Sequence, residues 1–178
     1  MTGTEGDIGA RIATLKEGDL PARHGAEEEL VRLGVAAVEP LIEAIRETPD
    51  TDFRWYAARV LARIGTPAIP RLVGALRSEK DPGVRRYIAA SLGEMGEKAV
   101  DPLMALLSDP EPELRGFAAL ALCRVGRPAV QPLSAALDDE DETVRSCAAL
   151  ILWQMGEDGI EALGKALGPG ESEGKRDG

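Results

Sequence analysis

One glycine recurs along this chain at a nearly constant interval. It stands at Gly34, Gly65, Gly96, Gly126 and Gly156, at intervals of 31, 31, 30 and 30 residues. Other columns keep the same register: an arginine stands eleven residues before each glycine, and leucines stand four residues before it and seven after it. A period of about 30 residues predicts a stack of similar supersecondary units, because no single unit of that size buries its own apolar face.

The third unit, residues 81–110, shows how each repeat is expected to fold. Asp81 followed by Pro82 is typical of a helix start, and Gly96 favours the left-handed backbone that ends a first helix. The apolar residues of both helices recur at helical spacing: Val84, Ile88, Leu92 and Met95 in the first, and Val100, Leu103 and Leu107 in the second. Each unit is therefore predicted to be a helix–turn–helix.

The arginine column has a regular acidic companion. The arginines are Arg23, Arg54, Arg85, Arg115 and Arg145, and Asp19, Asp50, Asp81, Glu111 and Asp141 stand four residues before them. An acid and an arginine at this spacing form an ion pair on one helix, worth about 0.2–0.5 kcal/mol. We interpret the column as structural rather than ligand-binding, with each arginine stem lying against the neighbouring repeat.

The units resemble the short HEAT-like repeats first noted in phycobilisome lyase subunits. The resemblance is carried by VRRYIAASLGEMGEKAVDPLMALL at 84–107 and by its counterparts LRGFAALALCRVGRPAVQPLSAAL and VRSCAALILWQMGEDGIEALGKAL. It implies an all-α fold, a right-handed α-solenoid of about five helix-turn-helix repeats with an N-terminal half-repeat cap. The first helices would then form the convex side and the second helices the concave side.

The domain organisation follows the repeats. We expect a capping helix over residues 1–18, a repeat domain over 19–168 and a disordered tail over 169–178, which is Gly-rich, charged and without apolar residues. The predicted repeats are 19–49, 50–80, 81–110, 111–140 and 141–168. Glu27, Glu28 and Glu29 stand where the other repeats, apart from Arg59, have small or apolar residues, which is typical of the polar outer face of a capping repeat.

Charge and hydropathy limit the classes of partner. The formal net charge of −10 argues against a nucleic-acid partner, which would need a basic face. No apolar run reaches 18 residues, and the opening MTGTEGDIGA lacks the layout of a secretory signal. We therefore expect a cytoplasmic protein without a membrane partner.

The residues offer little chemistry. Deoxyhypusine hydroxylases, which look similar in repeat, bind a di-iron centre through His-Glu pairs, whereas this chain has one histidine, His24, followed by glycine. It also lacks the P-loop and CxxC motifs. We predict no catalytic residues, no metal and no cofactor, so the chain is not expected to be an enzyme. A chromophore-lyase-like or other enzyme-accessory role, acting with a second chain, is the alternative that the resemblance implies.

A binding surface is predicted on the second helices. Helical projection from each glycine places ten residues toward a groove, smooth in the middle and charged at its rims. They are Glu39, Glu43, Val73, Gly74, Arg77, Asp101, Met104, Ala105, Gln131 and Ala135. This groove would suit a peptide with small apolar anchors and basic flanks, although the same small residues also let helices curve and approach one another. Trp55, on the outward side of a first helix, is a separate candidate for a contact.

These observations favour a protein-interaction scaffold or adaptor that binds a partner polypeptide on its concave face without catalysis. A rigid curved face loses little ordering entropy on binding. A structural homo-oligomer is the remaining alternative.

Overall fold

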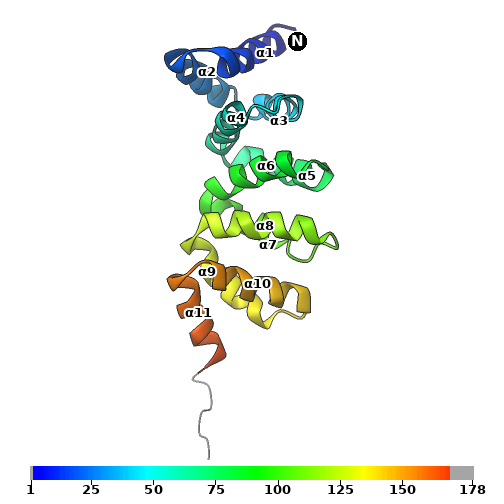
Figure 1. Ribbon diagram of the computed structural model, residues 1–178, viewed down its shortest axis with the longest axis vertical. Helices are drawn as coiled ribbons and strands as arrows, with labels where there is room; N and C mark the ends of the chain where they lie inside the picture. The colour runs from blue at the N-terminus through cyan, green and yellow to red at the C-terminus, as the bar shows by residue number, and fades with distance from the viewer. Residues whose placement is uncertain (1, 169–178) are drawn as a thin grey trace, which may run out of the picture.

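The computed structural model describes residues 2–168, without the side chains of residues 2–6 and 167. Helix α1 (Thr2–Glu17) is followed by successive helix pairs, which Figure 1 shows stacked along one long axis. The pairs are α2 (Leu20–Leu33) with α3 (Val38–Glu47), α4 (Thr51–Ile64) with α5 (Ile69–Ser78), α6 (Pro82–Glu94) with α7 (Val100–Met104), α8 (Pro112–Val125) with α9 (Arg127–Ala135), and α10 (Glu142–Gln154) with α11 (Glu157–Leu167). Short 3₁₀ turns lead into α3, α5 and α7, over Gly34–Ala37, Thr66–Ala68 and Gly96–Ala99, and another over Ala136–Asp138 follows α9. The predicted all-α solenoid is confirmed.

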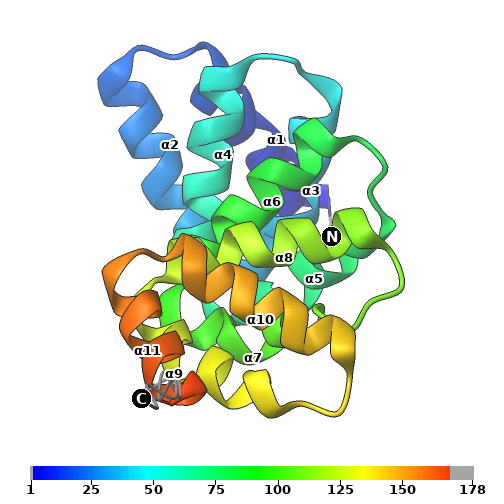
Figure 2. The ribbon, with the colours of Figure 1, turned by 60° about the horizontal axis from the view of Figure 1, so that its bottom comes forward.

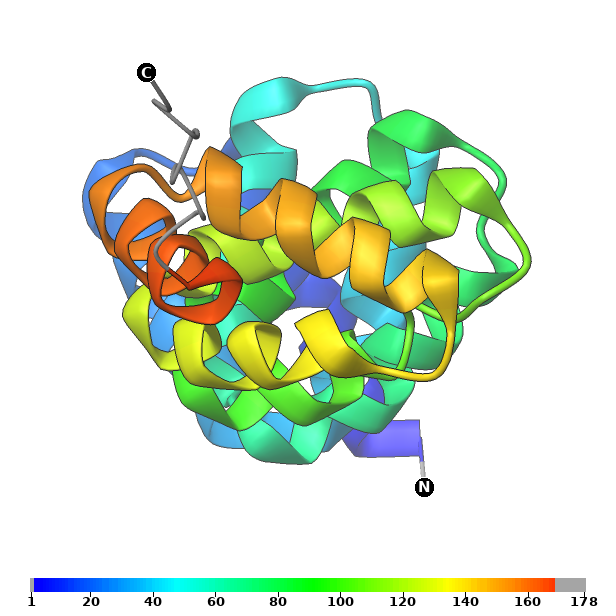
Figure 3. The ribbon, with the colours of Figure 1, turned by 90° about the horizontal axis from the view of Figure 1, so that it is seen from below.

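The helices form two layers. Figure 2 shows the first helices α4, α6, α8 and α10 succeeding one another on one face, and each contacts the next. The second helices α3, α5, α7, α9 and α11 also contact their neighbours in turn. Seen along the stack in Figure 3, α10 and α9 lie in adjoining but separate layers. Each layer therefore has its own outer surface.

The leucine columns form the core between the layers. The leucines four residues before each glycine, from Leu30 to Leu152, are fully buried, and so are those seven residues after it from Leu41 to Leu133. Leu163 of the last pair is only partly buried. At the other end, Ile8 and Leu15 of α1 are buried against the first repeat.

The recurring glycines adopt a backbone that other residues avoid. All five have φ between 61° and 77°. Their ψ, however, is −132° at Gly34, −148° at Gly65 and −140° at Gly126, which is not the left-handed helical region that the sequence predicts. This combination belongs to a region open essentially to glycine alone, so the repeat turn needs glycine rather than any residue that tolerates a left-handed cap.

The predicted ion pairs within the first helices were wrong. Arg23, Arg54, Arg115 and Arg145 donate instead to backbone carbonyls of the turn before their own helix or of the last turn of the preceding helix. Arg115 Nη1, for example, lies 2.8 Å from Asp109 O and 3.2 Å from Pro110 O. The carboxylates of Asp19, Asp50, Asp81 and Asp141 are occupied as helix N-caps, which removes them as partners.

The exception in this column is Arg85, which is fully buried and pairs with Glu111 of the next repeat at 2.5 Å. Three arginines also lie over an aromatic ring one repeat further on, at 5.3–6.0 Å from its centroid: Arg23 over Tyr56, Arg54 over Tyr87 and Arg85 over Phe117. The expectation that these side chains lie against the neighbouring repeat is confirmed for these three.

None of the described helices combines the length and the apolar character needed to span a membrane. The predicted tail over 169–178 lies outside the described residues.

Candidate functional sites

The residues predicted to form a groove lie on the second helices in order. Glu39 and Glu43 are on α3, while Val73, Gly74 and Arg77 are on α5; Asp101 and Met104 are on α7, and Gln131 and Ala135 are on α9. Ala105 directly follows the end of α7. Val73 and Met104 are half-buried against the core, and the others are exposed. The structure thus presents this row along the outer surface of the second layer.

Two of the charged residues in this row are held by neighbours. Glu43 accepts a hydrogen bond of 2.7 Å from Arg46, which also pairs with Glu79 of the next repeat at 2.7 Å. Arg77 lies 3.6 Å from Asp109. These pairs reduce the charge that the row offers to a partner.

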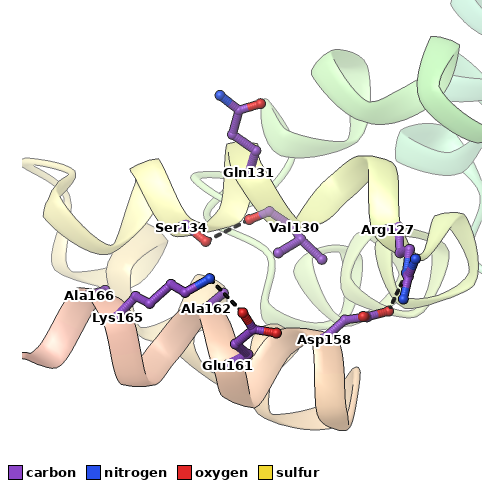
Figure 4. Close-up of a pocket in the computed structure, with 9 residues that line it drawn as sticks. All are labelled: Arg127, Val130, Gln131, Ser134, Asp158, Glu161, Ala162, Lys165 and Ala166. Carbon is purple, nitrogen blue, oxygen red and sulfur yellow. Dashed lines mark hydrogen bonds and ion pairs between the residues drawn. The ribbon is translucent and has the colours of Figure 1, made fainter.

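A hollow of about 680 Å³ lies between the last two second helices, α9 and α11. Figure 4 shows Val130 and Ala162 between the helices, with the Arg127–Asp158 pair toward one end and the Glu161–Lys165 pair beside it. Hydrogen bonds from Arg127 and Lys165 lower the pKa of Asp158 and of Glu161 respectively, so both acids are ionised partners. Of the predicted groove residues, Gln131 lines this hollow and points away from α11 in the view of Figure 4.

A second hollow, of about 290 Å³, lies on the opposite layer between α4 and α6 and reaches α8. Trp55, Ala58 and Arg59 line it from α4. Arg86, Tyr87, Ala90, Ser91 and Glu94 line it from α6, and Arg124 lines it from α8. We call it the Trp55 hollow. Trp55 is 50% exposed, as an outward residue should be.

The indole of Trp55 is held in a fixed environment. The Arg59 guanidinium lies 5.1 Å from the Trp55 ring centroid and 5.0 Å from that of Tyr56, and the two rings meet edge to face at 5.9 Å. Arg59 in turn donates to Glu27 of the previous repeat through Nε at 2.9 Å and through Nη2. The wall of the hollow is therefore organised before any partner binds.

Glu27 corrects the expectation of a solvated acidic face on the first repeat. Its side chain is 4% exposed and also accepts a hydrogen bond of 3.0 Å from Arg63. Burial acts to raise the pKa of Glu27, but the hydrogen bonds from Arg59 and Arg63 outweigh it and hold that pKa below its usual value. Only Glu28, 67% exposed, behaves as a solvated acid of the predicted kind, whereas Glu29 is partly covered and pairs with Arg11.

A third hollow, of about 390 Å³, lies on the same layer between α8 and α10. Phe117, Leu120 and Leu150 are its large apolar residues, and Glu113, Gly116, Ala119 and Gln154 complete its lining. We call it the Leu120 hollow. Leu120 and Leu150 are 57% and 53% exposed, and Trp153, one turn beyond Leu150, is 65% exposed.

Sequence reasoning identified Trp55 as an outward residue but did not identify the two hollows of this layer. The signal was present in the column six residues before each glycine, which reads Glu28, Arg59, Ala90, Leu120, Leu150. This column changes along the stack from charged to apolar, and all but one of its members line one of the two hollows of the first layer. Within the described part of the chain, no group of three or more His, Cys, Asp or Glu residues is placed to hold a metal ion.

Comparison with known proteins bears on this architecture. The family model described as HEAT repeats matches residues 38–111 and 100–173. Two solved structures are similar at 27% identity. One is a chain of the complex of CpcE and CpcF of phycocyanin lyase from Nostoc sp. PCC7120, with 81% of this chain and 96% of that chain covered and a TM-score of 0.41. The other is human deoxyhypusine hydroxylase in complex with glycerol, with 90% and 67% covered and a TM-score of 0.44. Among curated proteins, no significant match was found.

Paired helices stacked in two layers define an α-solenoid repeat protein. The family model covers most of the chain, and the chain belongs to the HEAT-repeat family.

Proposed function

We propose that this protein is a non-catalytic scaffold that binds another polypeptide. The observation that carries the proposal is the row of large apolar side chains exposed on the first-helix layer, on Trp55, Leu120, Leu150 and Trp153. Isolated exposed apolar residues are common on protein surfaces, but here three of the four line hollows on one continuous face. Exposed tryptophan is a frequent anchor of protein interfaces.

The first-helix face has an advantage over the groove predicted on the second helices. Its hollows contain aromatic and leucine side chains that a partner would cover, whereas the second-helix row offers mainly small and ion-paired residues. Burial of apolar area gives about 25 cal/mol per Å², so the first-helix face has more to gain from a contact. The groove remains a prediction, and it supplies the control in the test below.

The test is an affinity capture from the source cells with the purified full chain, followed by reconstitution with the captured polypeptide in purified form. Leu120→Asp with Leu150→Asp alters the first-helix face at two exposed positions, while Ala105→Arg alters the second-helix groove without touching the core. We expect the reconstituted complex to form with the parent chain and with Ala105→Arg, and to be lost in the double variant. Loss with Ala105→Arg alone would move the site to the groove.

Two alternatives have their own readouts in the same experiment. Visible absorbance in the captured material would favour the chromophore-lyase-like accessory role. A molecular mass that rises with protein concentration in light scattering, with no captured polypeptide, would favour a structural homo-oligomer. Either result would replace the scaffold proposal.

A further inference from the structure

The Trp55 hollow carries a positive charge that the chain does not neutralise. Among its charged residues, Arg59 is paired with Glu27, and Arg124 with Glu94 at 2.6 Å. Arg86 is exposed and has no ion-pair partner among the described side chains. One unpaired guanidinium therefore stands beside an exposed indole in a chain with a formal net charge of −10.

Arginine and tryptophan together favour a particular kind of ligand group. A free guanidinium binds carboxylates through charge-assisted hydrogen bonds, and a neighbouring aromatic wall covers the apolar part of the bound side chain. Because Arg59 is already held by Glu27, Tyr56 and Trp55, Arg86 is the rim cation left to meet a partner. A basic partner would have to approach this unpaired charge and is disfavoured.

The Leu120 hollow has the opposite character. Its large side chains are apolar, and its one acid, Glu113, already lies 3.3 Å from the buried Arg85. The side chain that suits it is a leucine, methionine or aromatic group of a partner. The first-helix layer therefore presents a cationic, aromatic site toward its N-terminal half and an apolar site toward its C-terminal half.

The distance between the two hollows sets the length of the ligand. One lies between α4 and α6 and the other between α8 and α10, so they are two helix spacings apart. With helix axes about 8–10 Å apart, this separation is about 16–20 Å. An extended chain rises about 3.3 Å per residue and covers it in about five or six residues.

We propose that this face binds a partner segment that carries a carboxylate at Arg86 and Trp55 and a large apolar side chain in the Leu120 hollow. The partner is thus an acidic polypeptide segment with an apolar anchor about five or six residues away when extended. This inference rests on the proposed function, because it names the partner of the same first-helix face. It differs from the basic flanks predicted for the second-helix groove, since the charge exposed on the two faces differs.

The experiment is a selection of random dodecapeptides displayed on phage, with the purified full-length chain as bait. Enriched peptides are then synthesised and titrated against four chains: the parent, Arg86→Glu, Leu120→Ser with Leu150→Ser, and Arg71→Glu. Arg71 is exposed on α5 and has no ion pair within the described residues, so its reversal is a matched charge control on the other layer. Circular dichroism confirms that each variant is folded.

We expect enriched peptides to combine Asp or Glu with a large apolar residue at this spacing. Arg86→Glu should weaken binding at least about tenfold, because a hydrogen bond to a charged group is lost and a like charge replaces it. The leucine double variant should weaken it to a similar degree, and Arg71→Glu less than about twofold. Peptides that are basic, or that bind Arg86→Glu as well as the parent, would overturn this inference while the scaffold function stands. A selection that enriches no peptide would overturn this inference too, and the scaffold function would then be decided by the capture experiment.

Discussion

The buried carboxylate of Glu27 gives a sharp test of how the repeats are joined. Glu27→Gln keeps the size and shape of the side chain but removes its charge and one acceptor oxygen. In the structure that carboxylate accepts from Arg59 Nε at 2.9 Å, from Arg59 Nη2, and from Arg63 Nη1 at 3.0 Å. The amide would direct an N–H group at one of these donors, so at least one hydrogen bond between the first two repeats is lost.

The size of the expected loss of stability in Glu27→Gln depends on how exposed the two arginine partners are. Removing one member of a fully buried ion pair costs about 3–5 kcal/mol, since the other charge is left buried. Here Arg59 and Arg63 are 34% and 40% exposed, so water partly hydrates them once Glu27 is neutral. We therefore expect the free energy of unfolding to fall by about 2–3 kcal/mol, below the fully buried range.

The neighbouring residue supplies the control. Glu28→Gln makes the same chemical change on the same helix, but Glu28 is 67% exposed and accepts a single hydrogen bond, of 2.8 Å, from Arg63. Exposed pairs of this kind contribute about 0–1 kcal/mol. The assay is urea unfolding followed by circular dichroism, together with amide hydrogen exchange of α2 and α4, because a repeat protein can open one unit at a time.

The reasoning is refuted if Glu27→Gln costs less than about 0.5 kcal/mol, or no more than Glu28→Gln. The pH dependence gives an independent check. The folded pKa of Glu27 lies below its ordinary value, so its contribution to stability is complete above the unfolded pKa and disappears as pH falls through the folded pKa. The difference between the parent and Glu27→Gln should accordingly shrink in acid rather than in base.

Three further predictions concern the repeat itself. Gly126→Ala should lower the free energy of unfolding by about 1–3 kcal/mol through backbone strain alone, since φ is 74° and an added Cβ meets no atom within 4 Å. The control is Gly116→Ala, where the added Cβ is equally unobstructed but the backbone is helical, so the change should be neutral or stabilise by up to about 1 kcal/mol. Equal losses of stability in urea unfolding would contradict the backbone explanation. Arg115→Met should cost about 1–3 kcal/mol by leaving the carbonyls of Asp109 and Pro110 without their donor, and a loss below about 0.3 kcal/mol in the same assay would show that water replaces it. Leu103→Ala, at a fully buried position, should cost about 2–5 kcal/mol, and a calorimetric midpoint within 1 °C of the parent would argue against a packed core there.

Much of the fold was predictable because its information is local. Helical spacing, the N-cap acids and the glycine turns all lie within one 30-residue unit, and the fully buried Leu30 and Leu61 follow from that unit's apolar stripe. The acids of the arginine column show where this reasoning ends. Asp50 and Asp81 stand at a suitable spacing for an ion pair, yet each caps its helix: Asp50 accepts from the N–H of Asp52 at 2.9 Å and Asp81 from that of Gly83 at 2.7 Å.

The binding surface was only partly predictable. Trp55 was expected to be outward and is exposed, but most of its neighbours in the hollow come from α6 and α8, 30 to 70 residues further along the chain. Arg86 stands ten residues before its glycine, as Trp55 does, but this shared position does not show that the two side chains line one site. Which columns of successive repeats meet depends on how far each unit is rotated on the one before it.

The sequence by itself determined that this protein is a stack of paired helices with a leucine core, because periodic burial of apolar residues is decided inside each unit. Only the tertiary structure decided which groups the charged and aromatic side chains contact at the junctions between units. Glu27 is buried rather than solvated, Arg115 holds backbone carbonyls rather than an acid, and Arg86 is left unpaired beside Trp55. The outcomes for Glu27 and Arg86 depend on contacts between successive repeats, which no pattern within one repeat specifies. That of Arg115 depends on the local geometry of the turn before its helix, which the spacing of acid and arginine does not reveal.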